Sequence, residues 1–299
     1  FYQEKLLFDP LSATSLGDNR YNDTLTNYIS DDYINALSAF YSKYDEALSA
    51  YNVDELNETQ QINLEVLKWE CSIIKEGLSL LIPQTPYPVY GEPTLQILPV
   101  NQTFSFHLEF SGWAGGNGIH PFNTTEDYYD WINRIEDFSG YIETVIFNMN
   151  EGIKKNIVYP KFITQKMIDQ LDALAHSTVE DHIFFKPAKQ FPDNFTEEEK
   201  EDLKNVYSEI IRDLVIPKFS ELKLFLEETY LPAGPETFAF SDFSGGEEAY
   251  EYLIKYWTTT DMTADEIFEI GKQEVERIKM EMEEVKEQVG YEGRLIDFL

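Results

Sequence analysis

The chain has 299 residues and a formal charge of −32, from 23 Lys and Arg against 55 Asp and Glu. Nucleic-acid binding requires basic residues against phosphates, and anionic membrane surfaces repel acidic chains, so this charge argues against both partners. Hydrophobic residues make up 42% and aromatic residues 15% of the chain, which predicts a folded protein with a large core. No apolar run reaches the ~18 residues that a transmembrane helix needs.

The first quarter of the chain predicts two long helices. Apolar residues recur at helical spacing in residues 31–51, after a Ser30 that can cap the helix. Residues 58–82 repeat the pattern and Pro83 ends it; one predicted face comprises Ile62, Val66, Trp69 and Ile73. The single cysteine, Cys71, lies among apolar residues and is expected in the core, and an intrachain disulfide is excluded.

Residues 83–121 hold many of the prolines and glycines and predict a departure from helix. Apolar and polar side chains alternate strictly from Phe104 to Phe110, which predicts a half-buried strand within a small β segment near residues 94–110. His107 and Glu109 would then share a polar face, either an ordinary solvated face or a pair facing a cleft. The glycine-rich residues 111–118 predict a connection, with a substrate-approach loop as the alternative.

The rest of the chain predicts further long amphipathic helices. Residues 126–151 and about 160–175 form two of them, and capping boxes at Thr196 and Thr263 open two more. The Thr196 helix of about 30 residues contains Pro217, a point of kinking. The Thr263 helix carries apolar residues in alternating steps of three and four, like a coiled-coil seam. The predicted fold is mainly α, a multi-helix single domain over residues 1–299.

No complete catalytic site is visible in the sequence. No His-Glu dipeptide occurs, so the helical zinc motif His-Glu-x-x-His is missing, and so is the serine motif Gly-x-Ser-x-Gly. His176 and His182 are six residues apart, which places two helical side chains on different faces. We therefore assign no catalytic residue and no metal ligand within this chain.

One stretch carries a specific family resemblance. Residues 245–260 read GGEEAYEYLIKYWTTT, followed by Thr263-x-x-Glu266-Ile267 and Glu274-Val275-x-Arg277-Ile278. This pattern resembles the bacterial family named domain of unknown function 885. Residues 9–17 (DPLSATSLG) and residues 152–161 are similar to the opening and the middle of that family.

The resemblance implies a helical N-terminal half of a zinc peptidase-like hydrolase of the gluzincin type. The family motif His-Glu-x-x-Pro-Gly-His-His would lie beyond Leu299, so zinc is implied for the full-length protein and not for residues of this chain. The implied partners are a peptide substrate and the protein's own C-terminal catalytic half. The resemblance also suggests a periplasmic or cell-envelope lipoprotein. The start at Phe1 and the apolar run at residues 295–299 lead us to expect a longer native polypeptide.

The predicted half would form one wall of a substrate cleft, and this chain alone is expected to be inactive. The candidate cleft residues are His107, Glu109, Trp113, Tyr256, Thr258, Thr259 and Thr260. The three threonines have a second interpretation, in which they only end one helix before Thr263 caps the next. The alternative function is a non-enzymatic helical binding or scaffold protein of the cell envelope.

Overall fold

The computed structural model describes residues 1–103, 105–236 and 239–299, which divide into two compact units. Unit 1 comprises Phe1–Ala249 and unit 2 comprises Tyr250–Leu299. The fold is mainly α, as the periodicity predicts, with one small sheet in the described residues. Within these ranges no helix is both long enough and apolar enough to cross a membrane.

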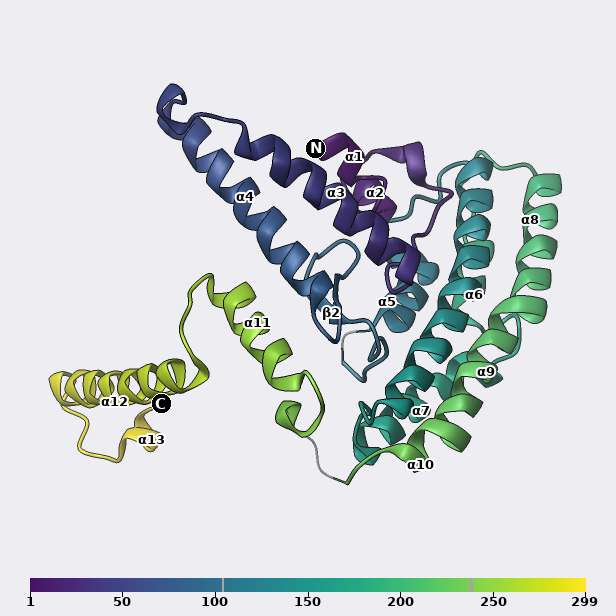
Figure 1. The fold of residues 1–299 in the computed structure, drawn as a ribbon. Helices are drawn as coiled ribbons and strands as arrows, with labels where there is room; N and C mark the ends of the chain where they lie inside the picture. The colour runs from purple at the N-terminus through teal and green to yellow at the C-terminus, as the bar shows by residue number, and fades with distance from the viewer. Residues whose placement is uncertain (104, 237–238) are drawn as a thin grey trace. The chain divides into compact units, whose positions relative to one another are not determined.

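Unit 1 begins with three short helical segments and a helical hairpin, and the rings of Phe1 and Phe8 contact Phe40 of the hairpin. The short segments are α1 (Tyr2–Lys5), α2 (Pro10–Ser15) and η1 (Asn19–Tyr21). The hairpin consists of α3 (Asp31–Ser49) and α4 (Glu58–Ser79), joined through η2 (Val53–Glu55), and Figure 1 shows its two helices side by side. The predicted Ser30 cap is confirmed, because its side chain accepts a hydrogen bond from the Tyr33 N–H. Cys71 is fully buried, also as predicted.

The predicted apolar face of α4 is only partly buried. Ile73 is buried, whereas Ile62, Val66 and Trp69 are exposed. The buried positions are instead Leu64, Cys71, Ile73, Ile74, Gly77 and Leu78, mostly in the second half of the helix. Periodicity identifies the helix but not the length over which a neighbour covers it.

The β segment lies earlier than the alternation predicts. β1 (Gln84–Pro86) pairs antiparallel with β2 (Pro93–Leu95), with Thr85 opposite Thr94. The predicted strand at residues 104–110 is wrong, because α5 (Phe106–Gly112) occupies most of it, and Phe104 lies outside the described residues. The glycine-rich segment is not an open loop either: η3 (Trp113–Asn117) continues the helical path, and Gly116 has φ +77°.

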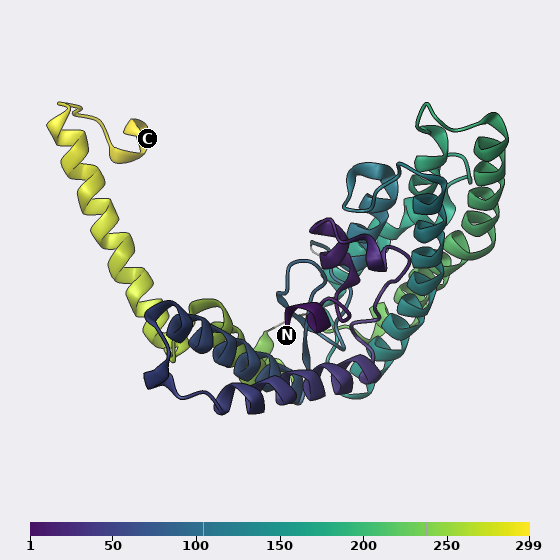
Figure 2. The ribbon, with the colours of Figure 1, turned by 90° about the horizontal axis from the view of Figure 1, so that it is seen from above.

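The largest core of unit 1 surrounds α6 (Thr125–Lys154), which begins at a Thr124 capping box. Buried residues recur along α6 in steps of three and four. α7 (Lys161–His176) and α9 (Ile216–Phe225) pack in the same layer (Figures 1 and 2). The short segments η4 (Ile183–Phe185) and η5 (Pro187–Lys189) follow α7 and lie beside α5 and η3.

A helical run from Glu197 to Ala233 confirms the predicted long helix after Thr196. It contains α8 (Glu197–Ile210), α9 (Ile216–Phe225) and α10 (Leu231–Ala233), separated by π-helical turns η6 (Ile211–Val215) and η7 (Leu226–Tyr230). Each π turn ends shortly before a proline, Pro217 or Pro232. Proline lacks an N–H and its ring collides with the carbonyl four residues earlier, so a wider turn relieves that collision.

After η8 (Phe240–Asp242), α11 (Gly246–Thr258) leads from unit 1 into unit 2. The main helix of unit 2 is α12 (Ala264–Gln288), and the predicted Thr263 capping box is confirmed by reciprocal hydrogen bonds with Glu266. A short helix, α13 (Leu295–Phe298), follows near the end of the chain.

Candidate functional site

An open hollow of about 350 Å³ in unit 1 brings together several polar side chains. Its walls come from the residues before and within α5, from η3, and from η4 and the residue that follows it. The lining residues are Thr103, Ser105, Leu108, Glu109, Gly112, Trp113, Gly115, Ile183 and Lys186. Two of the sequence-predicted cleft residues, Glu109 and Trp113, therefore lie at one site, and His107 lies directly behind it through Ser105.

Two glycines let the chain pass close to side chains that line this hollow, Trp113 and Ile183. A Cβ at Gly118 would lie 2.5 Å from the Cβ of Trp113, so only glycine lets the chain pass that close to the indole. A Cβ at Gly115 would lie 3.4 Å from Ile183 Cγ1, which marks the close approach of η3 to η4. Trp113 is only 8% exposed and makes an edge-on contact with Phe106.

Ser105 and His107 form a buried hydrogen-bonded pair behind the hollow. The Ser105 Oγ and His107 Nδ1 are 2.7 Å apart, and both side chains are almost fully buried. Burial lowers the pKa of His107 to about 3, so the ring is neutral at neutral pH. Its Nε2 has no hydrogen-bond partner among the described residues. The neutral ring can thus hold the Ser105 hydroxyl at the edge of the hollow.

Glu109 and Lys186 give the hollow two opposite charges, and the two side chains do not form an ion pair with each other. Both side chains are half-buried, and no ion pair joins either to another described residue. Burial raises the pKa of the Glu109 carboxyl above its usual range. A half-buried carboxylate, an ammonium group and an indole wall can accept the polar groups of a small ligand or a peptide segment.

The predicted shared polar face of His107 and Glu109 is wrong. In a helix, residues two apart point roughly 200° away from each other, so His107 enters the core while Glu109 faces the hollow. The sequence signal that would have found the helix is Phe106, Phe110 and Trp113, spaced by four and three residues. Lys186 could not be found this way, because it joins the site from a distant segment.

The other sequence-predicted cleft residues belong to unit 2. Tyr256 is half-buried in α11 with an edge contact to Trp257. The Thr258 hydroxyl donates to the Ile254 carbonyl at 2.8 Å and lies 2.8 Å from the Thr260 hydroxyl, and Thr259 has φ +55°. These are the interactions of a helix end, as the second interpretation of the threonines expects.

Sequence reasoning missed a buried cation in α6. Arg134 is fully buried and donates Nε to the Thr24 carbonyl at 3.1 Å, and Nη2 to Thr14 Oγ1 at 2.6 Å and the Tyr21 carbonyl at 3.0 Å. Its Nη1 lies 2.8 Å from His120 Nδ1, while His120 Nε2 lies 2.7 Å from the Asp127 carbonyl. These bonds fasten the N-terminal segment to α6. Burial lowers the pKa of Arg134 to about 10 and that of His120 to about 4.

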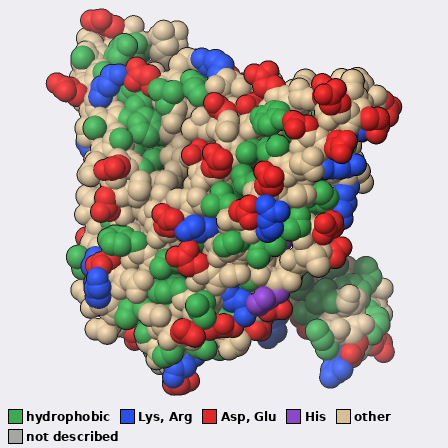
Figure 3. Space-filling view, turned by 90° about the vertical axis from the view of Figure 1, so that its right-hand side faces the viewer, with side chains coloured by type: hydrophobic (Ala, Val, Ile, Leu, Met, Phe, Trp, Pro, Cys, Tyr) green, Lys and Arg blue, Asp and Glu red, His purple; other side chains and the backbone are tan. Residues whose placement is uncertain are grey.

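The described residues do not fit a zinc ion. Among them no group of three His, Cys, Asp or Glu side chains lies close enough to share a metal. His176 lies beside Asp172 on the surface, and buried His182 caps η4 by accepting the Phe184 N–H. On the face in Figure 3, acidic side chains are scattered among basic and apolar ones.

Comparison with known proteins establishes the family. The chain is similar to the crystal structure of "the putative lipoprotein from Colwellia psychrerythraea", with a TM-score of 0.83 and 20% sequence identity. The match covers 98% of this chain and 50% of that chain, so this chain spans about half the length of that structure. A comparison with curated proteins gave no match. The profile of the bacterial proteins of unknown function DUF885 matches residues 10–299, and the chain therefore belongs to this family.

Proposed function

We propose that this chain is the helical N-terminal half of a longer zinc-dependent, peptidase-like hydrolase. In this proposal the chain binds peptide and the zinc ligands come from residues outside it. The observation that carries the proposal is the match to a solved structure over 98% of this chain but only half of the other. The sequence pattern at residues 245–278 resembles the DUF885 family, and that family resemblance is what implies a gluzincin-type peptidase.

The hollow at Glu109 and Lys186 is the proposed peptide-contacting surface of this half. Lys186 can donate to a peptide carbonyl or carboxylate, and Glu109 can accept from a peptide N–H or ammonium group. Trp113 offers an apolar wall in the same hollow. The roles proposed for these residues are binding and orientation of the peptide.

The test uses the full-length gene product. Its zinc content is measured by elemental analysis, and hydrolysis is measured with a panel of internally quenched peptides. The proposal predicts bound zinc and cleavage that a chelator abolishes. A full-length protein that binds no zinc and cleaves no peptide would refute the hydrolase and favour the alternative, a helical binding or scaffold protein of the envelope.

Two variants examine the hollow separately. Glu109→Gln and Lys186→Gln are expected to raise KM by about tenfold each, with kcat little changed, because they remove ground-state binding contacts worth about 1.4 kcal/mol. Lys189→Gln is the matched control, since Lys189 is an exposed lysine three residues away and outside the hollow. An unchanged KM in both variants would refute the proposal that the hollow forms part of the substrate cleft.

We also propose a cell-envelope location for the full-length protein. The support is the description of the matched Colwellia protein as a lipoprotein. Fractionation of cells that express the full-length gene, with detection of the protein in the envelope fraction, tests this location. Recovery in the cytoplasmic fraction alone would contradict it.

A further inference from the structure

α12 carries an apolar stripe that the rest of unit 2 leaves open to solvent. The stripe, here called the α12 seam, repeats with heptad spacing and consists of Phe268, Val275, Ile278, Met282, Val285 and Val289. The exposed fraction of these residues runs from 37% at Met282 to 65% at Phe268, and no residue of α12 is buried. An exposed apolar surface of this length marks an interaction site.

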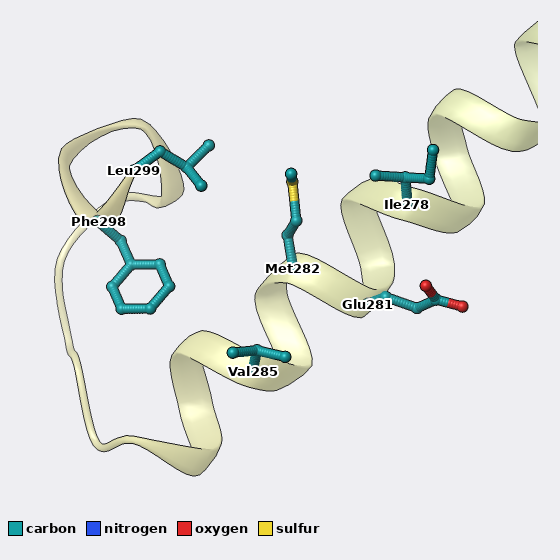
Figure 4. Close-up of a pocket in the computed structure, with 6 residues that line it drawn as sticks. All are labelled: Ile278, Glu281, Met282, Val285, Phe298 and Leu299. Carbon is teal, nitrogen blue, oxygen red and sulfur yellow. The ribbon is translucent and has the colours of Figure 1, made fainter.

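The chain's own end covers only part of the α12 seam. Phe298 and Leu299 face Met282 and Val285 across an open hollow of about 250 Å³, as Figure 4 shows. Leu299 itself remains 73% exposed, so the contact does not exclude water. The first half of the seam, with Phe268 and Val275, lines no part of this hollow.

Charged edges run along both sides of the α12 seam. Lys272, Lys279 and Lys286 recur every seven residues on one edge, and Glu274 and Glu281 do so on the other. In helix pairing these edge positions select the partner by opposite charge. A matching surface is therefore an amphipathic helix with acidic residues opposite the lysine edge and basic residues opposite the glutamate edge. A parallel copy of α12 would also meet this charge pattern, so the occupant is decided by other features.

A second copy of this chain is a poor occupant of the α12 seam. The seam is only three heptads long, and Gly271 stands at one of its core positions, where it provides no side chain to pack. Two copies would also bring together chains that each carry a charge of −32. In contrast, this chain matches only half of the solved Colwellia structure. The other half of that structure is about as long as this chain and could supply a covering helix.

We propose that the α12 seam is covered, in the full-length protein, by an amphipathic helix from the half of the polypeptide outside this chain. The inference rests on one part of the proposed function, namely that this chain is half of a longer protein. It does not depend on zinc or on peptide hydrolysis. It assigns α12 the role of joining the two halves.

Thiol labelling tests the proposal in the full-length gene product. Val285→Cys places a thiol in the α12 seam, and Met280→Cys is the matched control, an exposed apolar position on the outer side of the same helix. The native Cys71 is fully buried and adds little background. Labelling with a maleimide is followed by mass spectrometry of the peptides that contain each site.

The Val285→Cys thiol is expected to react at least about tenfold more slowly than the Met280→Cys thiol, because a covered thiol needs local opening before it reacts. In the 299-residue chain both thiols should react at similar rates. Equal rates in the full-length protein would overturn the proposal, and so would a reading frame that ends at Leu299. Slow labelling of the Val285→Cys thiol in the 299-residue chain itself would overturn the proposal as well. If that slow rate depended on protein concentration, a second copy of the chain would be the occupant of the seam. A protected seam in a zinc-free, inactive protein would refute the proposed hydrolase and leave this inference standing.

Discussion

Replacing the buried Arg134 by methionine is expected to destabilise unit 1 by about 3 kcal/mol. Methionine has an unbranched apolar side chain that can follow the same course as the aliphatic part of arginine, but it has none of the guanidinium donors. Arg134 makes four hydrogen bonds, to two backbone carbonyls, a threonine hydroxyl and a histidine ring. All four acceptors stay in place when the arginine is removed.

The magnitude follows from two opposing effects. Each buried acceptor that loses its donor costs about 1 kcal/mol or more, which gives about 4 kcal/mol or more for the four. Removing a buried charge returns part of this cost, because a guanidinium away from water is itself unfavourable. Thr14 also keeps a partner, since its hydroxyl lies 2.8 Å from Asn22 Oδ1. A net loss of about 3 kcal/mol is therefore expected.

Denaturation by urea, followed by tryptophan fluorescence, measures this loss. Trp131 is a suitable reporter because its ring lies 5.0 Å from the His120 ring that contacts Arg134. Arg212→Met is the matched control, since Arg212 is exposed and, among the described residues, forms an ion pair with its neighbour Asp213 alone. This variant should leave the midpoint unchanged. The pKa of His120 should also rise in Arg134→Met, because a nearby positive charge is removed. An Arg134→Met variant as stable as the parent would refute the reasoning.

Three further outcomes are expected. Thr196→Ala should cost about 1 kcal/mol in urea denaturation, because it removes the α8 capping box, and a loss near zero would contradict that role. Gly246→Ala should lower the melting temperature, since its Cβ would lie 1.5 Å from the Phe240 carbonyl oxygen. In contrast, the Cβ of Gly271→Ala would meet no atom within 4 Å, and this variant should stabilise α12 by up to about 1 kcal/mol. The pKa of His120 is about 4 in the folded state against 6.5 for an ordinary histidine, so the stability it contributes is complete above pH 6.5 and is lost as the pH falls toward 4. The stability difference between the parent and His120→Gln should therefore fall by up to about 1.4 kcal/mol per pH unit in that window, and a constant difference would contradict it.

The helices of this protein follow from local sequence. Ser30, Thr124, Thr196 and Thr263 each cap the helix that the pattern predicts, because a cap needs only its own side chain and the next turn. The heptad spacing of apolar residues is likewise enough to identify the α12 seam. The same kind of local pattern misleads at residues 104–110, where a run of apolar and polar residues fits both a strand and a short helix.

Burial and the candidate site depend on the tertiary structure, because they join segments that are distant along the chain. Lys186, which lies between η4 and η5, lines the same hollow as Glu109, and Arg134 bonds to residues more than a hundred positions earlier. No spacing rule connects such residues. The extent of burial is equally non-local: α4 has a regular apolar face, yet its neighbours cover only the part near Ile73 and leave Ile62 and Val66 exposed. Local sequence therefore determined where the helices lie, while the packing of distant segments decided which of their side chains are buried and which line the hollow.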